Sequence, residues 1–402
     1  MIRVLILCAS LMAGAPTNGV AQSQPAQIDT ARTTVSQSWR GETTLSIGLS
    51  RPMPFRVYTL DAPARLVIDV ENTEWMDNAA HELAVGSDAI SAMRFGRIRP
   101  GWSRMVADLE HPALPHDVSM SSQKDGTATL TLTLAKAEPE VFQETSGAPK
   151  TALWPQSKKP RAQSPGADGR FVVVLDPGHG GIDPGAERQG VTEKALMLAF
   201  ARELRAALLA SGDLDVVMTR HEDVFVSLQA RVAAAHHAGA DLFLSLHADA
   251  LTQGGAQGAT VYTLSKEASD AASAQLAARH NRADVLAGID LTGSDDQVTG
   301  VLLDLARQET APRAQAFAHT LVKSLDAAGG PVNRRALRSA GFTVLKSADI
   351  PSVLLEVGFL SSPRDLTNLT DSAWRKGIAE AIVVAVDEWR TQDQERRALL
   401  RQ

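Results

Sequence analysis

The chain has 402 residues, of which 44% are apolar and 21% charged, so it can bury a sizeable core and is not a largely disordered protein. At about 100–200 residues per domain, this length predicts two or three folding units. The formal net charge of -6 provides no electrostatic basis for nucleic acid as a partner, and none is expected.

The first 21 residues have the pattern of an export signal. Arg3 supplies a positive charge, the apolar stretch after it is too short for a membrane span, and the small residues Gly19 and Ala21 precede a cleavage position. The alternative is a buried N-terminal strand or helix. We expect secretion to the periplasm, no stable membrane span and no disulfide, because the single cysteine, Cys8, lies inside the signal.

Residues 36–140 are predicted to form a small all-β sandwich domain. Polar and apolar residues alternate there with a period of two, and Gly, Pro, Asp and Asn separate the runs. The clearest runs are 43–49, 65–70, 103–109 and 127–134. Strands of this kind bury one face each, as they do in two packed antiparallel sheets.

A linker and an α/β domain are predicted next. Residues 141–169 are rich in Pro, Gly, Ser and basic residues and have no apolar period, which is typical of an exposed linker. Over 170–392, short apolar runs alternate with helical patterns, which predicts a mostly parallel or mixed sheet with helices on both faces. The strands are expected at 171–175, 215–219, 242–246, 260–264, 343–346 and 352–356.

Three helices of this domain have clear sequence signals. Thr192 is expected to cap a helix whose apolar residues recur at every fourth position. These residues are Leu196, Phe200, Leu204 and Leu208. The other two helices are expected from 228 to about 237 and from 373 to about 390, and the charged tail at 391–402 is expected to fray.

Four polar side chains stand at special places in this α/β frame. His179 follows the first strand, His247 ends the third, and Glu356 ends the last. Glu193 lies in the first turn of the helix that Thr192 precedes. Because ligands collect outside the carboxyl ends of the strands in open α/β sheets, we expect these side chains to meet.

Two imidazoles and a carboxylate are the ligand set of a catalytic zinc ion, which keeps a fourth position for water and lowers the pKa of that water to about 7. A second carboxylate can then move the proton of the water to the leaving group.

Taken singly, a strand-end His is more often a hydrogen-bonded surface residue, and a first-turn Glu more often complements the helix dipole. Glu356, however, interrupts an apolar run, where an unpaired carboxylate is unfavourable. Nearby glycines are expected to allow unusual φ angles and close approach of substrate: Gly178, Gly180, Gly181 and Gly185.

Several motifs follow one another in one order, at 175–181, 183–186, 192–194, 219–220, 245–250 and 351–361. Through them, residues 171–390 resemble the zinc amidases of the type 3 family. The resemblance implies that His179, Glu193 and His247 bind Zn²⁺ and that Glu356 is the catalytic carboxylate. The implied reaction is hydrolysis of the amide between N-acetylmuramic acid and L-alanine in peptidoglycan, in wall remodelling and daughter-cell separation.

The β-rich region resembles the AMIN domain at 64–70 and 94–106. That domain targets such amidases to peptidoglycan, so the resemblance implies a wall-targeting role. A generic β-sandwich spacer is the alternative interpretation.

Residues 265–312 form a polar, Ala-rich insertion that resembles the regulatory segment of division amidases at 281–284 and 301–306. In those relatives a helix plugs the site, a glutamate caps the zinc, and an activator protein withdraws the helix. The resemblance therefore implies a periplasmic activator that binds the insertion. Here His280 replaces the glutamate, and imidazole is an equally good zinc ligand. The alternatives are that zinc capping is lost, or that His280 is an ordinary exposed helix residue.

Two other functions remain open from the sequence. The same site would serve a zinc peptidase that cuts within the stem peptide, and the chain would bind the wall without cutting it if the site were catalytically dead. The presence of all four site residues disfavours the second alternative.

Overall fold

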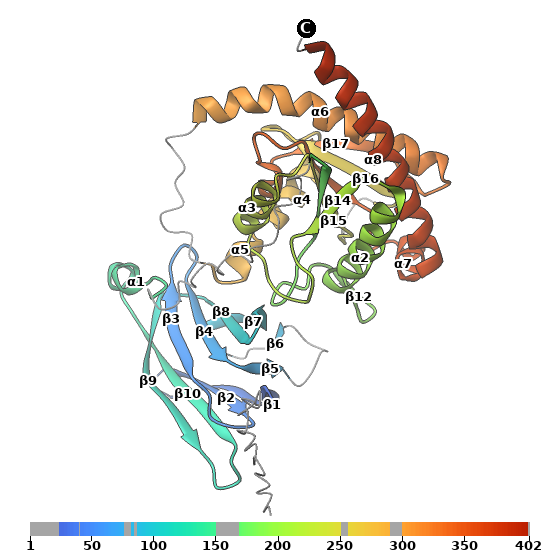
Figure 1. The fold of residues 1–402 in the computed structure, drawn as a ribbon. Helices are drawn as coiled ribbons and strands as arrows, with labels where there is room; N and C mark the ends of the chain where they lie inside the picture. Colours follow the sequence, from blue (N-terminus) through green and yellow to red (C-terminus); the bar gives the residue numbers. More distant parts are fainter. Residues whose placement is uncertain are drawn as a thin grey trace, which may run out of the picture.

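The computed structural model describes residues 24–39, 41–75, 82–83, 87–149, 169–250, 256–289 and 300–400, so the predicted signal and most of the predicted linker lie outside the described residues. An N-terminal β unit and a C-terminal α/β unit lie against each other (Figure 1). Within these ranges, no helix has the length and apolar character needed to cross a membrane.

The N-terminal unit is a sandwich of two five-stranded sheets, ordered β5-β1-β2-β10-β9 and β3-β4-β8-β7-β6. All strand pairs are antiparallel except β1 with β5. The first sheet comprises β1 (Ala26–Gln37), β2 (Thr43–Leu49), β5 (Thr73–Trp75), β9 (Ala113–Ser122) and β10 (Ala128–Lys136). The second comprises β3 (Phe55–Leu60), β4 (Arg65–Glu71), β6 (Glu82–Leu83), β7 (Ile90–Arg99) and β8 (Trp102–Leu109). The sandwich and its four predicted strands are confirmed, and β1 occupies a polar stretch to which no strand was assigned.

Alternation along the strands builds the core of this sandwich. In β10 the threonines face outward, while Leu130, Leu132 and Leu134 are buried and pack against residues of the opposite sheet. Phe142 joins the same core from helix α1 (Pro139–Thr145), at the start of the segment predicted as a linker.

The α/β unit has a six-stranded mixed sheet, ordered β14-β11-β15-β18-β16-β17. Its strands are β11 (Phe171–Pro177), β14 (Leu214–Met218), β15 (Leu242–His247), β16 (Ala259–Leu264), β17 (Val332–Ala340) and β18 (Ser352–Glu356). Neighbouring strands are parallel except β16 with β18, so the predicted fold class is confirmed. A short hairpin, β12 (Glu187–Arg188) with β13 (Val191–Thr192), precedes the first long helix.

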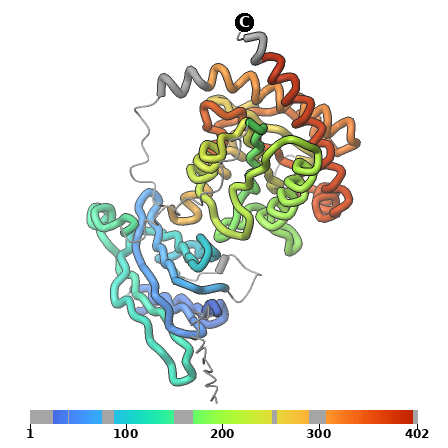
Figure 2. Tube along the Cα trace, in the orientation of Figure 1, coloured from blue at the N-terminus to red at the C-terminus, as the bar shows by residue number. Residues whose placement is uncertain are grey.

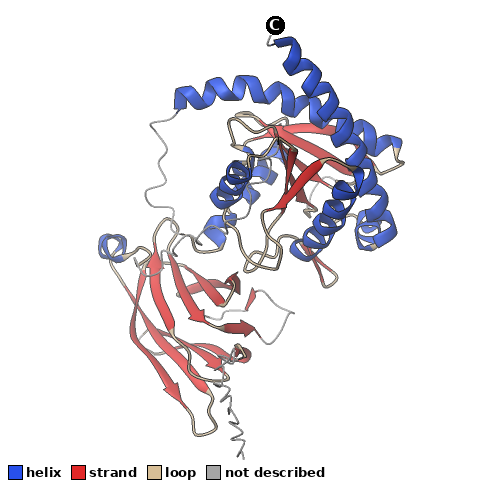
Figure 3. Cartoon of the chain, viewed as in Figure 1, coloured by secondary structure: helices blue, strands red, loops and turns tan. Residues whose placement is uncertain are grey.

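Helices cover both faces of this sheet (Figure 3). One face packs against α2 (Glu193–Ser211), α6 (Gly300–Ala327), α7 (Pro363–Thr370) and α8 (Ser372–Leu400). The other packs against α3 (Leu228–Ala238), α4 (Ala271–Asn281) and the 3₁₀ turn η2 (Thr343–Leu345). The short α5 (Ala283–Leu286) lies where the α/β unit meets the N-terminal strands (Figure 2).

Two local predictions were wrong. Residues 343–346 contain η2 rather than a strand, and the sheet instead gains β17, a polar edge strand that pairs only with β16 and therefore has a weak apolar pattern. Thr192 occupies the N-cap position of α2 but makes no capping hydrogen bond. The amides of Glu193 and Lys194 donate to the carbonyls of Ala186 and Pro184, so backbone carbonyls of the preceding loop replace the missing side-chain cap.

The C-terminal tail was also predicted wrongly, because α8 continues to Leu400 instead of fraying after 390. Asp393 is buried on the inner face of this extension and accepts two hydrogen bonds of 2.8 Å from the guanidinium of Arg313 on α6. This bidentate pair fixes the last turns of α8 to α6.

Replacing Asp393 with Ala should therefore lower the free energy of unfolding by about 3 kcal/mol, because it leaves the partly buried guanidinium of Arg313 without its carboxylate. The matched control is Lys376→Ala on the same helix, whose pair with Glu380 is exposed and should contribute less than about 1 kcal/mol. Urea denaturation of both variants measures the difference. Equal losses would show that the Arg313 pair does not anchor the tail.

Candidate metal site

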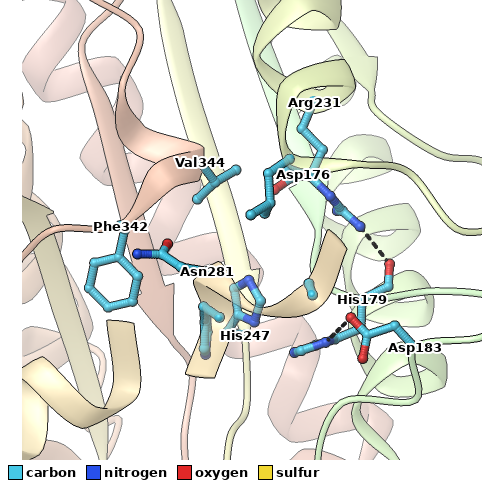
Figure 4. Close-up of a pocket in the computed structure, with 11 residues that line it drawn as sticks. Asp176, His179, Asp183, Arg231, His247, Asn281, Phe342 and Val344 are labelled. Carbon is cyan, nitrogen blue, oxygen red and sulfur yellow. Dashed lines mark hydrogen bonds and ion pairs between the residues drawn. The ribbon is translucent and has the colours of Figure 1, made fainter. Parts of the chain in front are cut away.

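The predicted site residues meet at the carboxyl edge of the mixed sheet. His247 and Glu356 are the last residues of the neighbouring strands β15 and β18 and are directly opposite in the register. His179 lies two residues beyond β11, and Glu193 begins α2. Figure 4 shows the two rings, His179 and His247, facing the same pocket. The structure thus brings all four predicted side chains together.

Glu193 is completely buried and links the two imidazoles. One carboxylate oxygen lies 2.9 Å from Nδ1 of His247, and the other lies 3.2 Å from Nε2 of His179. Amide groups of Ala248 and Ala186 donate one hydrogen bond to each oxygen, both 2.9 Å long. Burial opposes ionisation, but the two histidines outweigh it and hold the pKa of Glu193 well below its ordinary range. The carboxylate is therefore ionised at neutral pH.

Asp183 orients the His179 ring. Its carboxylate lies 2.8 Å from Nδ1, which leaves Nε2 turned toward the pocket (Figure 4). Burial disfavours a charged ring, yet Asp183 and Glu193 outweigh it and raise the pKa of His179 well above its ordinary value. Asp183 belongs to one of the motifs in the sequence, but its role as an orienting group was not predicted.

The pKa of His247 is shifted in the opposite direction from that of His179. Burial, reinforced by the neighbouring His280 ring, lowers the pKa of His247 to about 4, so the ring is neutral at pH 7. A neutral imidazole is the form that binds a metal ion. The ring is also tightly packed, because a Cβ added at Gly178 would lie 2.3 Å from its Cε1 atom.

The glycines near His179 also make room for the side chains of the site. The unusual φ angles are present, with φ +69 at Gly185 and φ +58 at His179 itself. A Cβ at Gly185 would lie 2.6 Å from the His179 ring and 2.7 Å from the Glu193 carboxylate. Gly178 and Gly185 thus leave room for the site's own side chains, a reason that differs from the expected approach of substrate.

Glu356 is completely buried beside these groups. One carboxylate oxygen accepts a 2.9 Å hydrogen bond from the amide of Asp249, and the other, Oε1, has no hydrogen-bond partner. Burial, together with the nearby carboxylates of Glu193 and Asp249, raises the pKa of Glu356 well above its ordinary range. Asp249 was not predicted as a site residue, although it lies in the motif with His247.

His280 enters the same site from α4. Its side chain is buried, and its Nε2 lies 3.7 Å from a carboxylate oxygen of Asp249 and 3.7 Å from Oε1 of Glu356. The ring centroid is 4.2 Å from that of His247 and 5.7 Å from that of His179. The interpretation of His280 as an exposed helix residue is therefore wrong.

The donor atoms fit a metal ion. Four buried atoms of these site residues have no hydrogen-bond partner, which is unfavourable unless something else satisfies them. They are Nε2 of His179, Oδ2 of Asp249, Nε2 of His280 and Oε1 of Glu356. Ligand atoms of the three histidines lie within 4.8 Å of one another, and so do those of Asp249, His280 and Glu356. The two groups share His280, and a cation bound in either group would satisfy atoms that otherwise lack a partner.

A buried cluster of imidazoles and carboxylates at the carboxyl edge of an α/β sheet is the arrangement of a metal-dependent hydrolase. The family model of N-acetylmuramoyl-L-alanine amidases matches residues 173–388, and that of the AMIN-like domain matches residues 4–72. The chain belongs to the N-acetylmuramoyl-L-alanine amidase family and is a peptidoglycan hydrolase of the cell wall.

Relatives match over much of the chain. It is 32% identical over 365 residues to the N-acetylmuramoyl-L-alanine amidase AmiC of Escherichia coli, covering 86% of this chain and 85% of that protein. It is 40% identical over 271 residues to AmiA of Escherichia coli, covering 65% of this chain and 88% of that protein. The catalytic domain of the amidase CwlV from Paenibacillus polymyxa has 26% identity and a TM-score of 0.40, covering 55% of this chain and 98% of that domain.

Replacing Asp183 with Asn should weaken divalent metal binding about 10–100-fold, because the His179 ring loses the carboxylate that orients it. Asp213→Asn, at an exposed position outside the pocket, is the control and should leave the affinity unchanged. Competition with a chromogenic chelator measures both affinities. Equal affinities in the two variants would exclude an orienting role for Asp183.

Proposed function

We propose that the chain binds Zn²⁺ through His179, Glu193 and His247 and uses it to hydrolyse the amide between N-acetylmuramic acid and L-alanine. Two imidazoles and one carboxylate are the donors that catalytic zinc prefers. The observation that carries the proposal is a buried cluster of donor atoms without hydrogen-bond partners, on His179, Asp249, His280 and Glu356, in an amidase-family chain.

When bound, zinc would polarise the scissile carbonyl and lower the pKa of a bound water to about 7. Glu356 is the group that moves the proton. Its Oε2 accepts a hydrogen bond from the Asp249 amide, while Oε1 has no hydrogen-bond partner and is free to take a proton from water. A carboxylate with a raised pKa can then release the same proton to the amine of the departing L-alanine. Asp183 meanwhile holds the tautomer of His179.

The N-terminal sandwich is proposed to bind peptidoglycan without cutting it. A polymer-binding module attached to the catalytic domain raises the effective concentration of the enzyme at its insoluble substrate. Together with export directed by residues 1–21, this module would place the activity in the periplasm, where wall is remodelled and daughter cells separate.

We further infer that His280 closes the site. Its unpartnered Nε2 shares the pocket with the proposed ligands, and imidazole is a good zinc ligand. Helix α4 would then be a plug that a periplasmic activator removes by binding the insertion at 265–312. Such a plug must favour the closed state by only a few kcal/mol, or no activator could shift the equilibrium.

Digestion of purified peptidoglycan with and without chelator, followed by mass analysis, tests the proposed reaction. An amidase releases intact stem peptides that begin with L-alanine, and the chelator should abolish their release. Fragments cut within the stem peptide would instead indicate the peptidase alternative, and the absence of any fragment from zinc-loaded protein lacking the plug would indicate a wall-binding scaffold.

Replacing Glu356 with Gln should keep zinc binding but lower hydrolysis about 10²–10⁴-fold, because the amide cannot take the proton of the water. His247→Ala is the contrasting variant, which should lose zinc as well as activity. Metal content by atomic emission and turnover on purified wall distinguish the two. Loss of zinc in Glu356→Gln would recast Glu356 as a ligand, and near wild-type turnover would assign the proton transfer to another group.

Replacing His280 with Ala should raise hydrolysis in the absence of any activator, because the plug loses the side chain that enters the site. Gln275→Ala, on the exposed face of the same helix, should leave basal activity unchanged. Basal rates on purified wall, with zinc content as a check, compare these variants. A wild-type rate already equal to that of His280→Ala would rule out closure by His280.

A further inference from the structure

Three arginines of the N-terminal domain reach across to the backbone that follows α4. Arg65 donates to the carbonyl of Val285 at 2.8 Å, and Arg94 donates to that of Leu286 at 3.2 Å. Arg104 donates to the next two carbonyls, those of Ala287 at 3.2 Å and Gly288 at 2.9 Å. Four consecutive carbonyls at the end of α5 therefore receive guanidinium groups, which also complement the negative end of a helix.

Each guanidinium is held in place by its own domain. Arg94 forms two short hydrogen bonds, 2.6 and 2.7 Å, with Asp108, and Arg104 forms a buried pair with Asp69. Arg65 donates to the carbonyl of Pro63. The donors are therefore directed at α5 before it docks, which lowers the entropic cost of the contact. In the docked state Arg65 and Arg104 are buried, and undocking would break these hydrogen bonds.

Apolar packing reinforces these polar contacts. Ala287 is fully buried in a cluster with Ile98 and Val106 of the N-terminal domain and with Ile182 and Phe225 of the α/β domain. The next residue, Gly288, has φ +65, and a Cβ there would lie 2.9 Å from the side chain of Val106. The fit leaves no room for a larger residue at this position.

The docked segment is connected directly to the plug. Only Arg282 separates the end of α4 from the start of α5. Asn281 holds the junction to the α/β domain, donating to the carbonyl of Gly341 and accepting from the amide of Thr343, and the carboxylate of Asp284 accepts from the amide of Leu228. Withdrawal of His280 with α4 therefore pulls on α5 and on its contacts with the three arginines.

We propose that the N-terminal domain is a latch for the plug. Its arginines Arg65, Arg94 and Arg104 hold α5, and through α5 they keep α4 and His280 in the closed position. This inference rests on the proposed closing role of His280. The domain then has two functions, wall binding and restraint of the catalytic site, and a partner or wall strand that separates it from α5 favours opening.

Two substitutions in the full-length protein weaken the latch, one in the N-terminal domain and one in the segment just after α5. Arg94→Gln removes a guanidinium whose partner, Asp108, remains partly exposed to solvent, and Gly288→Leu forces α5 away from Val106. The matched controls are Arg170→Gln, at a surface ion pair, and Gly329→Leu, which has a similar φ of +71 but nothing within 4 Å of its Cβ position. Thermal unfolding followed by circular dichroism confirms that each variant is folded.

Hydrogen exchange of the backbone amides in α4 is the main measurement, because it does not depend on catalysis. Loss of one charged hydrogen bond in Arg94→Gln, and the steric displacement in Gly288→Leu, should each accelerate exchange over residues 274–281 about tenfold or more, and neither control should do so. Basal hydrolysis of purified wall should rise in parallel. Faster exchange confined to residues 285–289, with α4 unchanged, would overturn the latch. Faster exchange in α4 without faster hydrolysis would support the latch and overturn the closing role of α4.

Discussion

The geometry of the site depends on one buried ion pair, that between Asp176 and Arg231. Their side chains are 2.6 Å apart and almost fully buried, and Asp176 also accepts hydrogen bonds from Thr219 and Ser245. Arg231 donates in addition to the carbonyls of Pro177 and His179, which fixes the loop after β11. Burial alone would raise the pKa of Asp176, but Arg231 and the hydroxyl donors outweigh it and lower it. This network joins β11, β15, α3 and the residue that follows β14, and it holds His179 in its left-handed backbone conformation.

Much of the fold and the members of the site could be predicted from the sequence, because each leaves a local signal. Alternation marks β10, continuous apolar runs mark β11 and β15, and the site residues interrupt or end those runs. The edge strand β17 leaves little signal, since it has one neighbour and few buried side chains. Asp183 and Asp249 could not be distinguished from ordinary loop carboxylates, because their roles depend on contacts with His179 and Glu356 that only the folded chain creates.

Helix α4, the proposed plug, combines precise placement with weak anchoring. Asp270 caps α4 by accepting from the amide of Ser273, and the side chain of Asn281 fixes its other end, so the position of His280 is well defined. Most of the apolar burial by α4 comes from Leu276 and Ala277, which is little area for an 11-residue helix. Polar ends define where such a helix docks, while the small apolar contact keeps its release within reach of a binding partner.

The polar edge strand β17 affects how two copies of the protein can associate. An unpaired strand edge can form backbone hydrogen bonds with a strand of a second chain. Enzymes that gather on one insoluble polymer would meet one another at high local concentration. Arg334 and Arg335 are exposed on β17, while Arg338 on the same strand pairs with Asp270. Two copies approaching edge to edge would bring like charges together before any backbone hydrogen bond could form. The basic edge therefore disfavours edge-to-edge pairing of two copies of this sheet.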